Sequence, residues 1–459
     1  MQNPCAFASV RAGHSYRTMS SGDTIFALSS GALPSGVAVM RISGPNVEAL
    51  ASICRGGLPV DRQPVLRVLE DSRHGIIDRA LVLRMWAPHS FTGEDTVELH
   101  LHGGRAVVSA CLDALGTIAG FRHAEPGEFS RRAFLNGKVD LYEAEALADL
   151  ITADTEAQRR MAIENSAGAN SRIWSDWMED LTEARALLEA EFDFSDEEDV
   201  PDSMISDIVA RLNTIISRMR MELDRVHSSE IISEGFRVVL AGAPNVGKSS
   251  LLNSLAKRDV AIVSDEAGTT RDLVEVSLDL DGFKLVVTDT AGFRSDAGRV
   301  ERLGIERANA AIDRADLVLW ISSPEQECNV SLGEFPGKDV WLVRNKADLE
   351  AKSVGHGYRH QISVATGAGL DSLLADLAST VRLATQKGTG TPLLFRSRQQ
   401  DLCIQAVSSL ENALQMLGVA PELAAEDLRV AMRSIGRITG TVDVEDLLDV
   451  IFSRFCVGK

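Results

Sequence analysis

The stretch that decides the fold runs Phe236-Arg-Val-Val-Leu-Ala241, then Gly242-Ala-Pro-Asn-Val-Gly-Lys-Ser249, then Ser250-Leu-Leu-Asn-Ser-Leu255. Its three parts predict an apolar strand, a glycine-rich loop and a helix. The loop matches the pattern GxxxxGK[ST], in which glycines let backbone N–H groups surround phosphate oxygens. We expect Lys248 to reach the β- and γ-phosphates and the Ser249 hydroxyl to bind Mg²⁺. A chance glycine-rich turn is the alternative, but the strand, loop and helix follow in register. The stretch therefore predicts a nucleotide-phosphate site at a helix start, where the helix dipole favours anions.

Three further short motifs follow in the order that a GTPase needs. Asp289-Thr-Ala-Gly292 ends a predicted strand, so its carboxylate can hold Mg²⁺ through water and the Gly292 amide can meet the γ-phosphate. In Asn345-Lys-Ala-Asp348, Asp348 would accept two N–H donors of guanine. Adenine lacks that donor pair and would leave the carboxylate unpaired, so the site selects GTP over ATP. Ser363-Val-Ala365 can support the base from its backbone. Each motif is weak alone, but their order predicts a guanine-nucleotide site.

The segment between these motifs supplies the switch and the candidates for positioning water. In Gly268-Thr-Thr-Arg-Asp272, Thr270 is expected to bind Mg²⁺ only while the γ-phosphate is present. Phe293 stands where many GTPases carry a water-orienting glutamine, and an apolar ring cannot do that work. Arg294 and Glu301 are the polar candidates nearby. From the residues alone, Glu301 reads equally well as a solvated acid at a helix start.

The nucleotide-binding residues predicted in this way lie in five segments of the chain. They are Asn245, Val246, Gly247, Lys248, Ser249, Ser250, Ser264, Asp265, Glu266, Ala267, Gly268, Thr269, Thr270, Asp289, Thr290, Ala291, Gly292, Asn345, Lys346, Ala347, Asp348, Ser363, Val364 and Ala365.

The regions on either side of this module have different periodicities. From Asp23 to about Phe121, strand-like runs at Val37–Ile42, Ala80–Met85 and Val97–His102 precede a helical pattern, which indicates an α+β region. Helical periodicity then extends from about residue 139 to 232, and it returns beyond residue 392. The order helical, α/β, helical predicts one helical bundle with the α/β module inserted in a loop.

The predicted fold is therefore multidomain. It has an α+β N-terminal domain, an all-α helical domain and an inserted α/β P-loop GTPase domain of the Ras-like kind. The predicted segments are an extension (1–22), the N-terminal domain (23–138), the first helical part (139–232), the GTPase domain (233–386) and the second helical part (387–459).

The composition excludes several classes of protein. A net charge of −19 argues against a surface that coats nucleic acid, so we expect no DNA partner. The sequence has no apolar run of ~20 residues, and its six dispersed cysteines form no CxxC, so we expect a cytoplasmic protein without membrane contact. Residues 1–22 contain no acid; we favour a disordered tail, or a start at Met19, over a transit peptide.

Outside the GTPase module, three motifs carry a resemblance to a known family. They are Phe91-Thr-Gly-Glu-Asp95 with Glu98 and His102-Gly-Gly104, Ala133-Phe-Leu-Asn-Gly-Lys-Val-Asp-Leu141, and the terminal Phe455-Cys-Val-Gly-Lys459. With the nucleotide motifs, the chain resembles the MnmE/TrmE family of tRNA-modification GTPases from Asp23 onward.

The resemblance implies a K⁺-dependent GTPase that pairs two GTPase domains in a homodimer. It implies a heterotetramer with an MnmG/GidA-type flavoprotein, which carries FAD and uses NADH. Together they would add an aminomethyl or carboxymethylaminomethyl group to C5 of the wobble uridine of certain tRNAs. The one-carbon unit would come from a tetrahydrofolate derivative, in the 5-formyl or methylene form. In this family the N-terminal domain binds folate and forms the dimer.

The resemblance also assigns residues. Glu301 matches the water-positioning glutamate, which together with Lys248 and Arg294 makes the expected catalytic set. Asn245, Ser264, Glu266 and Thr269 match the K⁺ loop, although the family often has an apolar residue at the Glu266 position. Arg41, Glu98, Lys138 and Lys459 match the folate site. Cys456 is a candidate reactive thiol or a packing residue, and its role stays open.

Several alternatives remain. A ribosome-assembly GTPase that binds rRNA would share the nucleotide motifs, but it would usually add a basic module such as a KH domain. A folate-sensing scaffold would bind folate with negligible GTP turnover.

Some single residues also have a second interpretation. Glu98 reads by itself as a solvent-facing strand residue, and His100 and His102 have no third ligand nearby for zinc. Two basic clusters are either tRNA contacts or solvated faces: Arg211, Arg218, Arg220 and Arg225, and Arg122, Arg131, Arg132 and Lys138. We expect the partner to supply most of the attraction for tRNA.

Overall fold

The computed structural model of the chain describes residues 22–73, 75–166, 168–193, 203–258, 260–262, 275–289, 309–325, 335, 337–349, 357–386, 393, 396–442, 444–453 and 455–458. These residues belong to two compact units. The first is Met1–Glu145 with Gly436–Lys459, and the second is Ala146–Ile435. The domain boundaries expected from the sequence remain predictions.

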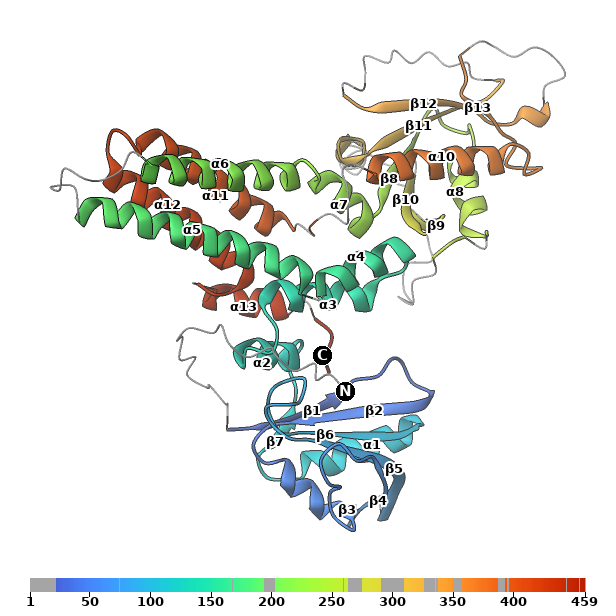
Figure 1. Cartoon of the computed structure of the whole chain (residues 1–459). Coiled ribbons are helices and arrows are strands. Elements are labelled where there is room, and N and C mark those ends of the chain that lie inside the picture. The colour runs from blue at the N-terminus through green and yellow to red at the C-terminus, as the bar shows by residue number, and fades with distance from the viewer. Residues whose placement is uncertain are drawn as a thin grey trace, which may run out of the picture. The chain divides into compact units, whose positions relative to one another are not determined.

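The first unit is built on a seven-stranded sheet in the order β3-β4-β5-β6-β2-β1-β7 (Figure 1). Neighbouring strands are antiparallel except for β1 and β7, which are parallel. The strands predicted from the sequence at 37–42, 80–85 and 97–102 are confirmed within β2, β5 and β6. The strands are β1 (Thr24–Leu28), β2 (Ser35–Ser43), β3 (Cys54–Arg55), β4 (Val65–Asp71), β5 (Gly75–Met85), β6 (Thr96–Gly103) and β7 (Phe121–His123).

The two faces of this sheet are covered differently. Strand alternation sends Phe26 and Ile42 to one face, where α1 (Arg105–Gly116) and the 3-10 helix η1 (Val47–Ser52) bury them. Ile25 and Ala27 point to the other face, where Phe129 of α2 (Glu128–Leu135) packs on them. Further along this second face, Leu66 and Leu81 lie opposite each other on β4 and β5 and are 62% and 39% exposed. The second face is therefore covered near β1 and open near β4 and β5.

The end of the chain returns to this first unit. Helix α13 (Glu445–Phe452) packs Leu448 and Phe452 in one apolar cluster with Leu141 and Phe134. Beyond it, the carbonyl oxygen of Cys456 accepts from the Gly127 N–H at 3.3 Å. The terminal motif is thus held beside the loop that leads into α2.

The second unit begins and ends with helices. Helix α6 contacts both α5 and α11 (Figure 1), so helices from before and after the α/β module form one bundle. This confirms the prediction that the module is inserted. The helices are α3 (Leu141–Thr152), α4 (Glu156–Ser166), α5 (Ala169–Asp193), α6 (Ser203–Leu223), α7 (Val226–Glu234), α11 (Ser397–Met416) and α12 (Pro421–Thr439); α3 and α12 extend from one unit into the other.

The inserted module has a six-stranded sheet in the order β13-β12-β11-β8-β10-β9, parallel except for the β9–β10 pair. Helices α8 and α10 cover one face through Leu251 and Leu373, and Ile312 packs near Val239 on the other. Its elements are β8 (Phe236–Ala241), α8 (Lys248–Ala256), β9 (Glu275–Leu280), β10 (Phe283–Asp289), β11 (Leu317–Ser322), β12 (Asp339–Arg344), the 3-10 helix η4 (Ala347–Leu349), β13 (His360–Gln361) and α10 (Leu370–Thr385).

This topology confirms the predicted α/β class and locates its functional edge. The strand order reverses around β8, because β10 and β11 lie on its two sides. In open parallel sheets, ligands bind outside the carboxyl ends of the strands at such a reversal. The loop after β8 is the predicted phosphate loop.

Among the helices that the structure describes, none combines the length and the apolar composition needed to cross a membrane.

Candidate nucleotide site and N-terminal polar sites

The loop between β8 and α8 folds around the side chain of Lys248. The Lys248 Nζ donates to the carbonyl oxygens of Gly242 at 2.9 Å and Ala243 at 2.8 Å, and the residue is only 5% exposed. Helix α8 starts at this lysine, directly after Gly247. A buried ammonium and the N–H groups of the first turn of a helix therefore lie together, which is the charge arrangement that binds phosphate.

Ser249, near the start of α8, and Asp289, at the end of β10, meet at the same edge of the sheet. The Ser249 hydroxyl donates to Asp289 Oδ2 at 2.5 Å, and Asp289 is 1% exposed. A hydroxyl and a buried carboxylate are oxygen ligands of the kind that Mg²⁺ prefers. The pair therefore fits a magnesium ion bound beside the phosphate loop.

The residues expected to bind the base lie after β12 and β13. The Ser363 hydroxyl donates to Asp348 Oδ1 at 2.5 Å, which fixes the carboxylate at the edge of the sheet. Asn345 is buried and links two loops: its Nδ2 donates to the carbonyl of Val246 at 2.9 Å, and its Oδ1 accepts from the Val364 N–H at 3.2 Å. The structure thus joins the predicted base-binding motifs to the phosphate loop.

Gly247 gives a testable consequence of this packing. Its φ is +99°, and a Cβ there would lie 2.3 Å from Asn345 Nδ2. We expect Gly247→Ala to force the loop and Asn345 apart, at a cost of about 1–3 kcal/mol. Fluorescent GTP analogue titration should show binding weakened at least about tenfold. Gly337→Ala is the control, because Gly337 also has a positive φ but has open space at its Cβ position. Equal binding by the two variants would contradict the packing argument.

Several predicted nucleotide and metal residues lie outside the described residues, so the structure does not test them. They are Ser264, Asp265, Glu266, Ala267, Gly268, Thr269, Thr270, Thr290, Ala291, Gly292, Arg294 and Glu301. Of the proposed K⁺ ligands, Asn245 alone is described, and its φ of +63° places it in the left-handed region.

In the first unit, two of the proposed folate residues meet across neighbouring strands. Arg41 on β2 is paired in register with Glu98 on β6, and Arg41 Nη2 lies 3.1 Å from Glu98 Oε1. The other carboxylate oxygen lies 3.3 Å from His100 Nε2. Both members of the Arg41–Glu98 pair are partly exposed, at 21% and 16% of their side chains. Glu98 is therefore an ion-paired acceptor at the surface, and not the simple solvent-facing residue that its sequence alone suggests.

The remaining candidates of the first unit have separate positions. The exposed Lys138 donates from Nζ to the carbonyl oxygen of Pro88 at 2.8 Å, and Lys459 lies outside the described residues. Cys456 is exposed, whereas burial raises the pKa of the Cys111 and Cys403 thiols to about 12. Cys456 is thus more accessible to reagents than these two buried thiols.

The two arginine clusters combine buried, paired and exposed side chains: Arg218 and Lys138 are exposed, and whether either cluster contacts tRNA stays a prediction. Arg132 and Arg225 are buried, at 6% and 8% exposure. The arginines that bind a carboxylate do so within the unit: Arg122 to Glu128, Arg132 to Glu94 and Glu128, Arg211 to Glu183, Arg220 to Glu411, Arg225 to Glu222, and Arg131 to Asp449.

The sequence patterns do not predict the aromatic side chains that surround Arg41. The guanidinium lies 5.4 Å from the ring centre of Phe91 and 5.8 Å from that of Phe129. Nothing in the periodicity brings these two rings together, because one is in a loop and the other on α2. The motif Phe91-Thr-Gly-Glu-Asp95 was a signal of resemblance, but it did not indicate this contact.

Glu128 makes the acid stability of the first unit testable. Burial alone would raise its pKa, but hydrogen bonds from Arg122, the Glu125 backbone and Arg132 outweigh that effect and lower the pKa from 4.5 to about 2. A lowered folded pKa adds stability above about pH 4.5, and this stability is lost as the pH falls through 2. Hydrogen exchange in α2 should accelerate over this window, after correction for intrinsic rates. In Glu128→Gln this pH dependence should be smaller, and an unchanged profile would contradict the assignment.

Similarity to known proteins agrees with this geometry. A family model described as the GTP-binding protein TrmE N-terminus matches residues 24–138, and one described as the MnmE helical domain matches residues 141–456. A tRNA modification GTPase MnmE of Chelativorans sp. is 50% identical over 438 residues, covering 95% of this chain and 98% of that protein. The chain belongs to the MnmE family. An MnmE of Mesorhizobium japonicum is 49% identical over 447 residues, covering 96% of this chain and 100% of that protein.

Among solved structures, Era of Aquifex aeolicus bound to GDP and AlF4⁻ is 24% identical in sequence. The match covers 38% of this chain and 66% of the Era chain. The TM-score of this match is 0.25.

The motifs that first suggested the MnmE family lie close together in the first unit. Asn136, from the second motif, donates through Nδ2 to the carbonyl of Thr92 in the first motif at 2.8 Å. Cys456, from the terminal motif, meets Gly127 just before α2. These segments, far apart in sequence, therefore gather around α2.

Proposed function

We propose that this chain hydrolyses GTP to GDP and phosphate with Mg²⁺ and K⁺, and that hydrolysis powers modification of C5 of the wobble uridine in certain tRNAs. The group added is aminomethyl or carboxymethylaminomethyl. A flavin-dependent partner of the MnmG/GidA type carries FAD, and a tetrahydrofolate derivative supplies the one-carbon unit. By its membership of the MnmE family, the chain is a tRNA modification GTPase.

One observation carries the proposal for GTP. Lys248, the Ser249–Asp289 pair and the Asp348–Ser363 pair gather at the carboxyl ends of the parallel strands β8, β10, β12 and β13. A phosphate-binding cation, a metal-binding oxygen pair and an acceptor for guanine donors are the three functions that a GTP site needs.

Each of these residues has a chemical task in the proposed reaction. Asp348 selects guanine, and Lys248 stabilises charge that develops on the phosphates. Ser249 and Thr270 would bind Mg²⁺ and Asp289 would hold it through water, and the bound ion would neutralise phosphate charge. Glu301 orients the attacking water, because Phe293 cannot, and Arg294 assists at the phosphate.

We further propose that Asn245, Ser264, Glu266 and Thr269 bind K⁺, as the family pattern implies. A monovalent cation there supplies positive charge where other GTPases use an arginine finger. Phosphate release should be at least about tenfold faster in KCl than in NaCl at equal ionic strength. Equal rates of phosphate release in the two salts would contradict the proposed K⁺ site but would not contradict the proposed GTP site.

For folate, we propose Arg41, Glu98, Lys138 and Lys459. Glu98 already accepts from Arg41 and His100, but a carboxylate has about four acceptor positions, so it can also accept the N–H donors of a pterin. Arg41 and Lys138 offer positive charge to the carboxylated tail.

The proposed homodimer would bury the open face of the first unit's sheet. Leu66, Leu81 and the 54% exposed Val37 support this, since a second copy would remove their apolar surface from water. We propose a heterotetramer of this dimer with the flavoprotein, acting on tRNA in the cytoplasm.

Nucleoside mass spectrometry of tRNA tests the whole proposal. Cells that lack the gene should accumulate wobble uridine without its C5 group, and the wild-type gene should restore the group. Unaltered tRNA nucleosides together with abnormal ribosomal particles would instead favour a ribosome-assembly GTPase.

A further inference from the structure

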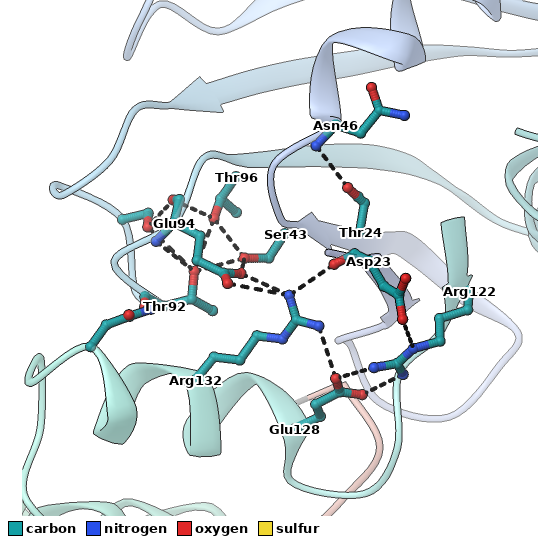
Figure 2. A network of polar contacts seen from close by, with 12 residues as sticks. Asp23, Thr24, Ser43, Asn46, Thr92, Glu94, Thr96, Arg122, Glu128 and Arg132 are labelled. Atoms are coloured by element: carbon teal, nitrogen blue, oxygen red, sulfur yellow. Dashed lines mark hydrogen bonds and ion pairs between the residues drawn. The ribbon is translucent and has the colours of Figure 1, made fainter. Parts of the chain in front are cut away.

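The loop that carries Phe91-Thr-Gly-Glu-Asp95 is held by a buried polar network (Figure 2). The Ser43 hydroxyl lies 2.7 Å from the Thr92 hydroxyl and donates to Glu94 Oε2 at 2.9 Å. Ser43 and Thr92 are 0% exposed. Glu94 therefore lies at the centre of a hydroxyl cluster that fixes the loop against the end of β2.

The same Glu94 carboxylate ties the loop to α2. Arg132 Nη1 donates to Glu94 Oε2 at 3.0 Å, and Arg132 Nη2 donates to Glu128 Oε1 at 2.9 Å. Arg122 Nη2 donates to Glu128 Oε1 at 2.6 Å, and its Nε donates to Asp23 Oδ2 at 3.2 Å. Figure 2 shows this chain of alternating charges from Glu94 to Asp23. The network is buried in its middle, where removing one charge leaves its partner uncompensated.

The Glu94–Arg132 pair joins the loop of residues 91–95 to α2. Each of these two elements also places an aromatic ring against Arg41. Phe91 comes from the loop, and Phe129 comes from α2, three residues before Arg132. Phe91 also packs with the apolar cluster of Ile25 and Phe129. Any movement of the loop relative to α2 would therefore change the aromatic walls around the Arg41 guanidinium.

We propose that Glu94 and Arg132 are positioning residues of the folate site: their ion pair fixes Phe91 and Phe129 around Arg41, and so holds the Arg41–Glu98 pair in the orientation that binds the ligand. The inference rests on the proposed folate function of Arg41 and Glu98. It adds two residues that do not touch the ligand but act through the aromatic walls. Glu94 also gives the motif Phe91-Thr-Gly-Glu-Asp95 a physical role.

The test measures binding of 5-formyltetrahydrofolate to the full-length chain by titration calorimetry. Glu94→Gln keeps the volume of the side chain and removes its charge. We expect its dissociation constant for the folate to rise about tenfold, on the scale of one lost charged hydrogen bond. GTP binding and hydrolysis in the absence of folate should not change, because these depend on the second unit. Glu156→Gln, which removes half of an exposed ion pair with Arg159, is the matched control and should bind folate normally.

A double-mutant cycle separates positioning from a general loss of stability. If Glu94 acts through Phe91, then Glu94→Gln should add little to the loss already caused by Phe91→Leu. Additive losses in the double variant would overturn the proposal. Arg132→Lys is a second test, since it keeps the charge but loses the two-pronged contact, and it should lie between wild type and Glu94→Gln. Circular dichroism should report a folded chain for each variant. If Glu94→Gln fails this test, Glu94→Asp replaces it.

The outcomes distinguish this inference from the proposed function. If wild type binds folate and Glu98→Gln does not, while Glu94→Gln binds like wild type, the positioning role is wrong and the folate site stands. If wild type does not bind folate, both are wrong.

Discussion

Replacing Asp348 by asparagine is expected to weaken GTP binding by roughly 10³-fold. The carboxylate would accept two N–H donors from guanine, whereas an amide keeps one acceptor oxygen and presents its NH2 group to the other donor, so that these two donors face each other unpaired. Xanthine carries a carbonyl where guanine carries its amino group, so the same variant should gain affinity for xanthosine triphosphate. Ser363 should hold the new amide in place, because its hydroxyl can also donate to the amide oxygen.

The measurement is a competition titration with GTP, ATP and xanthosine triphosphate. Asp371→Asn is the control: this acid, at the start of α10, has an 89% exposed side chain and should leave all three affinities unchanged. If Asp348→Asn retains wild-type affinity for GTP, guanine is read by other groups and the role of the motif Asn345–Asp348 is wrong.

Replacing Glu301 by alanine is expected to lower GTP turnover by about 10²–10⁴-fold while the dissociation constant for GTP stays within about twofold. Phe293 stands where other GTPases orient water with an amide, so the chain needs another polar group for that task. Glu301 lies outside the described residues, and the expectation rests on this chemistry and on the family's pattern.

Single-turnover hydrolysis with Mg²⁺ and K⁺ measures this effect without interference from product release. Arg294→Ala, made in parallel, should slow turnover less if Glu301 orients the water and Arg294 only assists. Normal single-turnover hydrolysis by Glu301→Ala would refute the water-positioning role.

The nucleotide module was predictable because its signals are local. A strand, a glycine-rich loop and a helix in sequence fix the position of Lys248, and Asp289, Asp348 and Ser363 each follow an apolar run. Parallel strands then bring such residues to one edge, so their meeting needs no further information. The structure added the contacts of Asn345, whose side chain joins the phosphate loop to the base-binding loop through Val246 and Val364.

The N-terminal site was predictable only through family resemblance. Arg41 and Glu98 are 57 residues apart, and their contact depends on the register between β2 and β6. Phe129 reaches Arg41 because α2 covers one end of a sheet face, which is a matter of tertiary packing. Arg122 and Arg132 looked like a basic surface, yet they are neutralised by Glu94 and Glu128 in the folded chain. Glu128 is a local partner, but Asp23 lies 99 residues from Arg122 and Glu94 lies 38 residues from Arg132, beyond the reach of local patterns.

Reconstitution with purified components tests whether GTP hydrolysis by this chain powers tRNA modification: unmodified tRNA, this chain, the proposed flavoprotein partner, the proposed folate donor, Mg²⁺, K⁺ and GTP. We expect the C5-modified nucleoside to appear together with released phosphate, and Lys248→Ala to abolish both. Modified nucleoside formed at the wild-type rate without GTP, or by the Lys248→Ala variant, would contradict this expectation.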